Sequence, residues 1–418
     1  QLDFLAGSII RGRFEIGGYD FNPILPPAAY GGQRVSSVPE AQRQAFPFQR
    51  GLFDDLDQEG LAPTPSLEEI RAQARQVMAD RALSGLSPYR LHFRSLSDGL
   101  RYDRAEGLYV GAGMQLRPQP DALVRLSAGY AFGRRRPSFG LSATGEPTPL
   151  VPVLEAYWDE LRDMGTFEGT APILASLGTA LGGRDYRDPF FARGMRLTLR
   201  GARPGIGPEF ALRWERHASA DNVLGGDVRP TRPVVEGILG AVSLAAPVAL
   251  PGKGQGTLTG TVGRLNDRTF ASMIAKAEWK LERPDRAWQF RTQVAAGAAT
   301  LRTPVQELFL LGGPGTLPGH DFRSYVGRRF WLARVEGTHP LVPPWVSLRS
   351  FAAVGATQLA SATLPDGWQD RDSQGVRASV GAGLSFGWNV LRLDAARGLR
   401  DGRWEIIFSV DPRFTPWL

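Results

Sequence analysis

The amino-acid sequence predicts an all-β fold: a transmembrane β-barrel of sixteen antiparallel strands, preceded by a short segment that contains one helix. Beyond position 88, apolar side chains alternate with small or polar ones almost throughout, which is typical of strands with one face in lipid and the other in a watery lumen. The 50 Gly, 32 Pro and 10 Trp indicate many short strands joined by turns. No run of about 18 consecutive apolar residues predicts a membrane-spanning helix.

The segment before the barrel contains one predicted helix, at residues 66–83. Ser66 and Glu69 form a capping box at its start, and apolar residues then recur at helical spacing. Two interpretations stay open: a helix packed on the periplasmic rim of the barrel, or a helix that enters the lumen and plugs it. The predicted organisation has three parts: a periplasmic or lumenal segment (1–87), the barrel (88–410) and a C-terminal tail (411–418).

The stretch from 376 to 388 shows the barrel pattern most clearly. Val376, Val380 and Leu384 alternate with small or polar residues such as Arg377. A membrane-spanning strand needs about 9–11 residues, so this stretch is long enough. The predicted strands are 88–96, 107–117, 122–132, 136–144, 150–159, 193–201, 208–217, 233–246, 254–265, 269–281, 286–300, 328–339, 345–356, 376–388, 389–397 and 403–410.

The lengths of the connections agree with this number of strands. Bacterial barrels of this kind have short periplasmic turns and longer outer loops. If the chain enters the barrel from the periplasm, the long connections all fall on the outer side: 160–192, 218–232, 301–327 and 357–375. The short turns then fall on the periplasmic side: 118–121, 202–207, 282–285 and 340–344.

Arginine dominates the charge of the chain, which has 49 Lys and Arg residues and a net charge of +7. The arginines are scattered along the alternating strands and form no compact patch, so nucleic acid is not an expected partner. The inward positions carry the charges that we single out as lumenal: Arg200, Arg213, Arg291, Arg334, Arg377 and Arg392, with Glu336 and Asp394. Either the lumen favours anions, or these arginines are paired with carboxylates.

Sequence motifs of common enzymes are missing from the chain. It has no H-E-x-x-H and no G-x-x-x-x-G-K. It also has no Cys and only four His, which disfavours a structural zinc site. We therefore expect no catalytic residues, no metal and no cofactor, and a protein that is not an enzyme.

One loop carries a motif of a known family. Residues 308–329 read LFLLGGPGTLPGHDFRSYVGRR and lie between the eleventh and twelfth predicted strands. This stretch resembles the sixth outer loop of the BamA/TamA superfamily of outer-membrane assembly and secretion barrels, also called bacterial surface antigens, whose pattern is GG-x-x-[ST]-[VL]-R-G-[FYH]. The matching residues are Gly312, Gly313, Thr316, Leu317, Pro318, Gly319 and His320. The fragment GLRYDRAEG at 99–107 is similar to the opening of related barrels.

Two departures from the family pattern are evident. The family's loop arginine is Pro318 here. Two interpretations of Arg323 stay open: it takes the place of that arginine, with Glu336 or Asp394 as its partner, or it is a solvated loop residue. Family members that insert or secrete proteins usually carry POTRA modules before the barrel, whereas residues 1–87 are too short and irregular for them. The resemblance is therefore to the short branch without POTRA domains.

The resemblance implies a Gram-negative outer-membrane protein that inserts or translocates protein or lipid. The expected working parts are the loop motif, with Arg323, and a seam between the first and last strands: Tyr89, Leu91 and Phe93 on one side, Trp404, Ile406 and Phe408 on the other. Expected partners are outer-membrane lipid and lipopolysaccharide, together with client proteins or other envelope subunits. Two alternatives stay open: a structural barrel that anchors subunits of an envelope complex, and a passive pore that prefers anions.

Overall fold

The computed structural model describes residues 89–411 apart from 120–121, 146–148, 168, 183–185, 202–206, 226–227, 283–287, 360–363 and 369–374, together with positions 41 and 45. The helix predicted at 66–83, and the tail beyond Asp411, lie outside the described residues. None of the helices in the described part of the chain is long and apolar enough to cross a membrane.

One antiparallel sheet of 17 strands makes up most of the described chain. Its strands are β1 (Tyr89–Leu91), β2 (Leu100–Asp103), β3 (Gly107–Gln119), β4 (Ala122–Ala131), β5 (Arg136–Thr144), β6 (Leu150–Asp163), β7 (Pro189–Gly201), β8 (Glu209–Ser219), β9 (Gly237–Leu250), β10 (Gly254–Leu265), β11 (Arg268–Glu282), β12 (Gln289–Ala299), β15 (Arg329–Val342), β16 (Val346–Gln358), β17 (Arg377–Phe386), β18 (Leu391–Gly398) and β19 (Trp404–Val410). From β3 onward, each pairs with the next one in this order, as in a meander.

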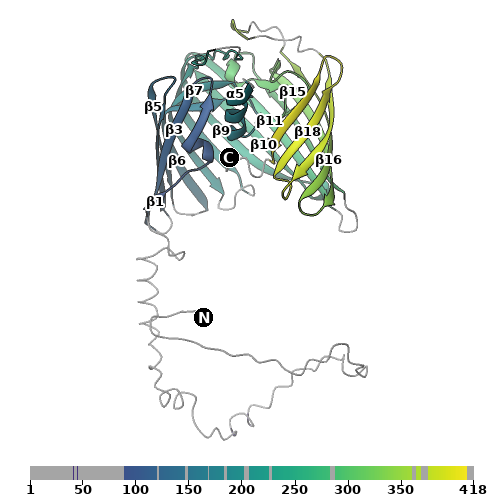
Figure 1. Cartoon of the computed structure of the whole chain (residues 1–418). Coiled ribbons are helices and arrows are strands. Elements are labelled where there is room, and N and C mark those ends of the chain that lie inside the picture. The colour runs from purple at the N-terminus through teal and green to yellow at the C-terminus, as the bar shows by residue number, and fades with distance from the viewer. Residues whose placement is uncertain are drawn as a thin grey trace. The chain divides into compact units, whose positions relative to one another are not determined.

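The remaining elements lie at the start of the sheet and in its connections. The helices are α4 (Leu96–Gly99) and α5 (Pro172–Gly182), with two short 3-10 helices, η2 (Pro251–Lys253) and η3 (Val305–Glu307). A separate two-stranded hairpin, β13 (Phe309–Leu311) with β14 (Tyr325–Gly327), lies between β12 and β15. The strands curve around a central space in which α5 is drawn (Figure 1).

The strand predicted at 88–96 differs from the structure. Only Tyr89–Leu91 is extended there, and β2 follows after α4, so both β1 and β2 pair with β3 along different stretches. A Cβ on Gly111 of β3 would lie 2.4 Å from the carbonyl oxygen of Asp98. The backbone of α4 therefore lies directly over β3, on the side that Gly111 faces. Glycine leaves room for this detour, and the alternation of apolar residues gives no sign of it.

The exposed side chains follow the predicted alternation and give the sheet an apolar outer face. On β16 and β17, Leu348, Val380 and Leu384 are exposed, whereas Arg349 and Ser379 are buried. Large apolar side chains lie outside and charged ones inside, which reverses the arrangement of a water-soluble protein. This pattern suits a sheet whose outer face meets lipid.

The long connections after β6, β8, β12 and β16 pack together at one end of the sheet, and we call them the cap. Their shared apolar core includes Met164, Val234, Leu308 and Trp368, one from each connection. Hydrogen bonds join them as well: Trp368 Nε1 donates to the carbonyl of Pro233 at 2.7 Å. These are the connections that were predicted to be long and to share one side, and they build one continuous layer there.

Candidate functional site

The lumenal loop, residues 312–324 between β13 and β14, is buried and folds into a tight turn. Gly312 has a φ of 114°, in the region that favours glycine. Its N–H donates to Thr316 Oγ1 at 2.8 Å, and the N–H of Gly313 donates to the carbonyl of Leu317 at 3.1 Å. Leu317 is 1% exposed and packs with Phe309 against the inner wall. The spacing of Gly312, Gly313 and Thr316 thus closes the loop on itself.

The tip of this loop contacts the last strands. The N–H of Gly319 donates to Glu405 Oε2 at 2.7 Å, and the carbonyl of Gly319 accepts from the N–H of Arg403 at 2.7 Å. A Cβ on Gly319 would lie 2.2 Å from the backbone nitrogen of Gly398, so no larger residue fits. His320 Nε2 lies 3.1 Å from the carbonyl oxygen of Ala378. Pro318 is buried between these contacts.

Arg323 is buried rather than solvated, and the partners predicted for it are wrong. Its Nη1 and Nη2 donate to the two carboxylate oxygens of Asp163 at 2.5 and 2.7 Å, and Nη2 also donates to the carbonyl of Phe167 at 3.2 Å. Asp188 lies 3.6 Å away. The loop therefore attaches to the connection after β6, and neither Glu336 nor Asp394 is its partner.

Asp188 is the centre of a wider cluster in the cap. Its carboxylate is fully buried and lies 3.0–3.6 Å from guanidinium nitrogens of four arginines: Arg104, Arg229, Arg232 and Arg323. Burial alone raises the pKa of a carboxyl group, but the arginines outweigh it and hold the pKa of Asp188 below its usual value. This cluster links four separate segments of the chain.

Glu336 and Asp394, the predicted partners of Arg323, form hydrogen bonds with a different arginine. Arg349 on β16 donates from Nε and Nη2 to Glu336 at 3.0 and 2.7 Å, and from Nη1 to Asp394. Arg392 and Arg334 lie 3.7 and 3.9 Å from Glu336. Because β15, β16 and β18 bring these charges together, alternation within single strands could indicate their direction but not their pairing.

The other predicted lumenal arginines differ in their surroundings. Arg213 is near Glu307 at 3.2 Å, and Arg291 is near Glu278 at 3.9 Å. Arg377 pairs with Asp401 at 3.1 Å. Arg200 is exposed and makes no ion pair with any described residue. Most of these arginines are thus paired, which favours the second of the two interpretations of the lumenal charge.

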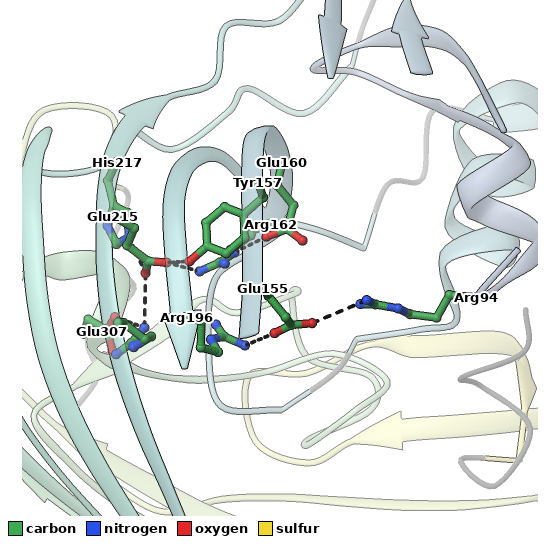
Figure 2. Close-up of polar contacts among 10 residues, drawn as sticks. Arg94, Glu155, Tyr157, Glu160, Arg162, Arg196, Glu215, His217 and Glu307 are labelled. Carbon is green, nitrogen blue, oxygen red and sulfur yellow. Dashed lines mark hydrogen bonds and ion pairs between the residues drawn. The ribbon is translucent and has the colours of Figure 1, made fainter. Parts of the chain in front are cut away.

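A buried network on β6 to β8 was not foreseen from the sequence, and Figure 2 shows it. Glu215 accepts hydrogen bonds from the Tyr157 hydroxyl and from Arg162 Nη1, the latter at 2.7 Å, and lies 3.0 Å from His217 Nε2. Arg213 bridges Glu215 to Glu307 of η3. The connection after β12 is thereby fastened to β8. The sequence signal was the alternation Arg213, Glu215, His217, which places three charged or polar groups on one face.

The seam lies between β1 and β2 on one side and β19 on the other. Within the described residues, no backbone pairing joins β19 to β1 or β2, whereas all successive strands from β3 to β19 are paired. The seam residues are exposed: Tyr89, Leu91, Phe93, Trp404, Ile406 and Phe408 are 46–79% accessible. Tyr89 and Leu91 belong to β1, Phe93 follows it, and Trp404, Ile406 and Phe408 belong to β19.

The connection after β6 touches both sides of this seam. Ser176 of α5 accepts from the N–H of Tyr102 on β2 at 3.1 Å. Ten residues further on, Tyr186 donates to Glu405 Oε1 of β19 at 2.7 Å. No helix was predicted at α5, although Pro172 at its start and the following Ala and Leu residues favour one.

Comparisons with known proteins give a fold but no family. No protein-family model matches the chain, and no curated protein matches it. Among solved structures, it is similar to BamA from Haemophilus ducreyi lacking POTRA domains 1–3, with 15% identity and a TM-score of 0.52, covering 78% of this chain and 71% of that one. Two CdiB structures also match: that from Acinetobacter baumannii (13% identity, TM-score 0.42, 74% of this chain) and that from Escherichia coli (16%, 0.41, 78%).

The chain spans 57% and 61% of the two CdiB chains, less than two thirds of each. At 15% identity, the likeness to BamA shows the fold alone. The described chain therefore has the fold of an outer-membrane β-barrel, as the strand pattern and the loop motif predicted.

Proposed function

We propose that this protein is a bacterial outer-membrane barrel that inserts or translocates protein or lipid, and that it acts at the seam between β1–β2 and β19. The observation that supports this proposal is that β19 has no backbone pairing with β1 or β2 within the described residues. β3 to β19 form a continuous ladder, whereas β1 and β2, on either side of α4, pair with β3. An edge strand presents free backbone donors and acceptors to any strand that approaches it.

The proposal includes a barrel of sixteen strand positions. Because β1 and β2 both lie beside β3, they occupy one position, and the 17 strands then fill 17 − 1 = 16 positions. An even number brings both ends of the barrel to one side of the membrane. In this arrangement, the cap lies on the outer side and the seam closes the circle.

The passive pore receives less support. Four long connections share one apolar core at the cap, which occupies that end of the lumen. Most lumenal arginines are paired with carboxylates, which reduces the field that would draw anions through. The role of a structural anchor depends on partner surfaces, and no single observation favours it.

A reversible cross-link at the seam tests the proposal. The chain has no Cys, so Leu100→Cys can be combined in turn with Trp404→Cys, Ile406→Cys and Phe408→Cys. The pair that forms a disulfide in highest yield is then used in a strain that depends on this chain. We expect its oxidised form to abolish the accumulation of folded outer-membrane proteins or of surface lipopolysaccharide. A reductant should restore that accumulation.

A matched pair within the wall is the control. Ala352 and Val380 are register partners on β16 and β17 and face outward, so Ala352→Cys with Val380→Cys adds a cross-link where the strands are already paired. It should leave activity unchanged. Full activity with the seam covalently closed would overturn the proposal.

A further inference from the structure

The outer wall of β3 to β8 contains a large apolar hollow. Its volume is about 920 Å³, within the range of roughly 300–1,000 Å³ found for small-molecule sites. Most of the side chains that line it are apolar and point outward; they include Met114, Leu126, Phe139, Trp158, Met195 and Trp214. Each of these is 39–60% exposed. An outer wall that only met fluid lipid would not require such a depression.

Two arginines lie opposite each other at one end of this hollow. Arg193 on β7 and Arg216 on β8 are direct register partners, and both belong to its lining. They lie near the start of β7 and the end of β8, at the end of the sheet that carries the cap. The next outward-facing register pair, Met195 with Trp214, lies directly beneath them within the hollow.

Of these two arginines, Arg193 has a carboxylate partner and Arg216 has none among the described residues. Arg193 Nε donates to Asp159 at 2.5 Å, and its guanidinium lies 4.5 Å from the centre of the Trp158 ring. Arg134 shares the same Asp159 at 3.2 Å. Arg216 is exposed and makes no ion pair or side-chain hydrogen bond with any described residue. Asp159 thus lies between Arg134 and Arg193, and Arg216 adds another positive charge at this end of the hollow; Glu106 and Arg136 also interact with Arg134.

This arrangement is unfavourable unless something negative lies against it. Like charges directly opposite each other on neighbouring strands destabilise a sheet, and apolar surroundings strengthen the repulsion because they screen it weakly. A phosphate group accepts bidentate hydrogen bonds from guanidinium groups and would offset the repulsion. The apolar surface beneath has the chemistry to hold alkyl chains.

We propose that this hollow is a binding site for a phosphorylated membrane lipid. The phosphate bridges Arg193 and Arg216, and the acyl chains lie along Met195 and Trp214 towards Met114. This inference depends on the membrane location of the barrel but not on any transport activity. Failure of the lipid-binding test would therefore leave the proposed activity at the seam untouched, and the reverse also holds.

Lipid retention by the purified full chain tests this site. Native mass spectrometry would measure binding of dioleoyl phosphatidate and of dioleoylglycerol, which has the same chains and no phosphate. We expect preferential binding of phosphatidate. Arg216→Gln should reduce that binding about ten-fold or more, the loss expected for one charge-assisted contact, and Arg216→Lys should retain part of it.

Arg264→Gln is the matched control. Arg264 is an exposed arginine on β10, on the same face as exposed Val262 and outside the hollow, so its replacement should leave binding unchanged. Heat-modifiable migration in detergent would verify that each variant is folded. Three outcomes would each overturn the proposal. The first is that the two lipids bind equally, the second is that Arg216→Gln binds phosphatidate as well as the wild type does, and the third is that Arg264→Gln loses as much phosphatidate binding as Arg216→Gln. Competition by free inorganic phosphate at the same concentration would likewise contradict a lipid site.

Discussion

Arg323 and Asp163 are 160 positions apart in the chain and form a two-pronged ion pair at 2.5 and 2.7 Å. This pair ties the lumenal loop to the end of β6, at the base of the cap. Arg323 is 3% exposed, so an unpaired charge left there would be costly. The attachment of the loop therefore depends on a residue that follows the motif, because the motif itself carries Pro318 where the family has arginine.

Loss of this pair should release the lumenal loop. We expect Asp163→Asn, which leaves Arg323 buried beside a neutral partner, to destabilise the docked loop by about 3 kcal/mol. Limited proteolysis between residues 312 and 324 measures the release. The double variant Asp163→Asn with Arg323→Ala should be cut little faster than Asp163→Asn alone, since the ion pair is lost in both and the further loss of the contacts to Asp188 and Phe167 is offset by removal of the unpaired buried charge. Additive effects would show that the two residues act independently.

The docking of the loop should weaken in acid because of His320. Its Nδ1 is within 3.0 Å of the Tyr325 hydroxyl, and burial lowers the pKa of His320 below its ordinary value. Protonation therefore favours the undocked loop: docking is strongest above about pH 6.5, the ordinary pKa, and weakens as the pH falls below it. Hydrogen exchange of the loop, followed from about pH 8 to pH 5, measures this. His320→Gln should remove the pH dependence, and an unchanged dependence would exclude His320 as its source.

Glu405 should couple the loop to the connection after β6. Its two oxygens accept from the N–H of Gly319 and from the Tyr186 hydroxyl. We expect Glu405→Ala to raise the accessibility of both segments to protease, whereas Tyr186→Phe should affect the connection alone. Planar-bilayer recording should detect more frequent channel openings in Glu405→Ala. Protection of both segments in Glu405→Ala would contradict this coupling.

The direction of the outer face can be tested with charge. Ala382 on β17 is exposed on the apolar side, and Ala382→Arg should destabilise the barrel by about 2–4 kcal/mol if it lies near mid-bilayer. Ala382→Leu is the control and should be neutral. The neighbouring Gly381 cannot serve as an inward test, since a Cβ there would lie 2.3 Å from the Phe351 ring. Unfolding by urea in lipid vesicles measures the difference.

The repeating part of the molecule was predictable from the sequence. Alternation along β17 indicated which side chains face inward, and the loop motif was recognisable because its glycines are local requirements of one turn. Contacts between distant segments were not predictable. Arg349 holds Glu336 and Asp394, and Asp163 holds Arg323, because the closeness of these residues depends on how the strands are ordered and where the connections fold. The interruption of the first predicted strand by α4 could not be predicted for a different reason. It depends on the free space above Gly111 of the neighbouring strand, β3.

The cap also has a consequence for how the chain assembles. Its apolar core draws Met164, Val234, Leu308 and Trp368 from connections spread over some 200 positions of sequence, so it cannot form until the strands that carry them stand side by side. Contacts so distant along the chain form slowly. Until then, these four connections have no common core. The strands would therefore pair first, and the cap would form last. Any process that inserts the strands into a membrane would move the four connections across it before they pack together.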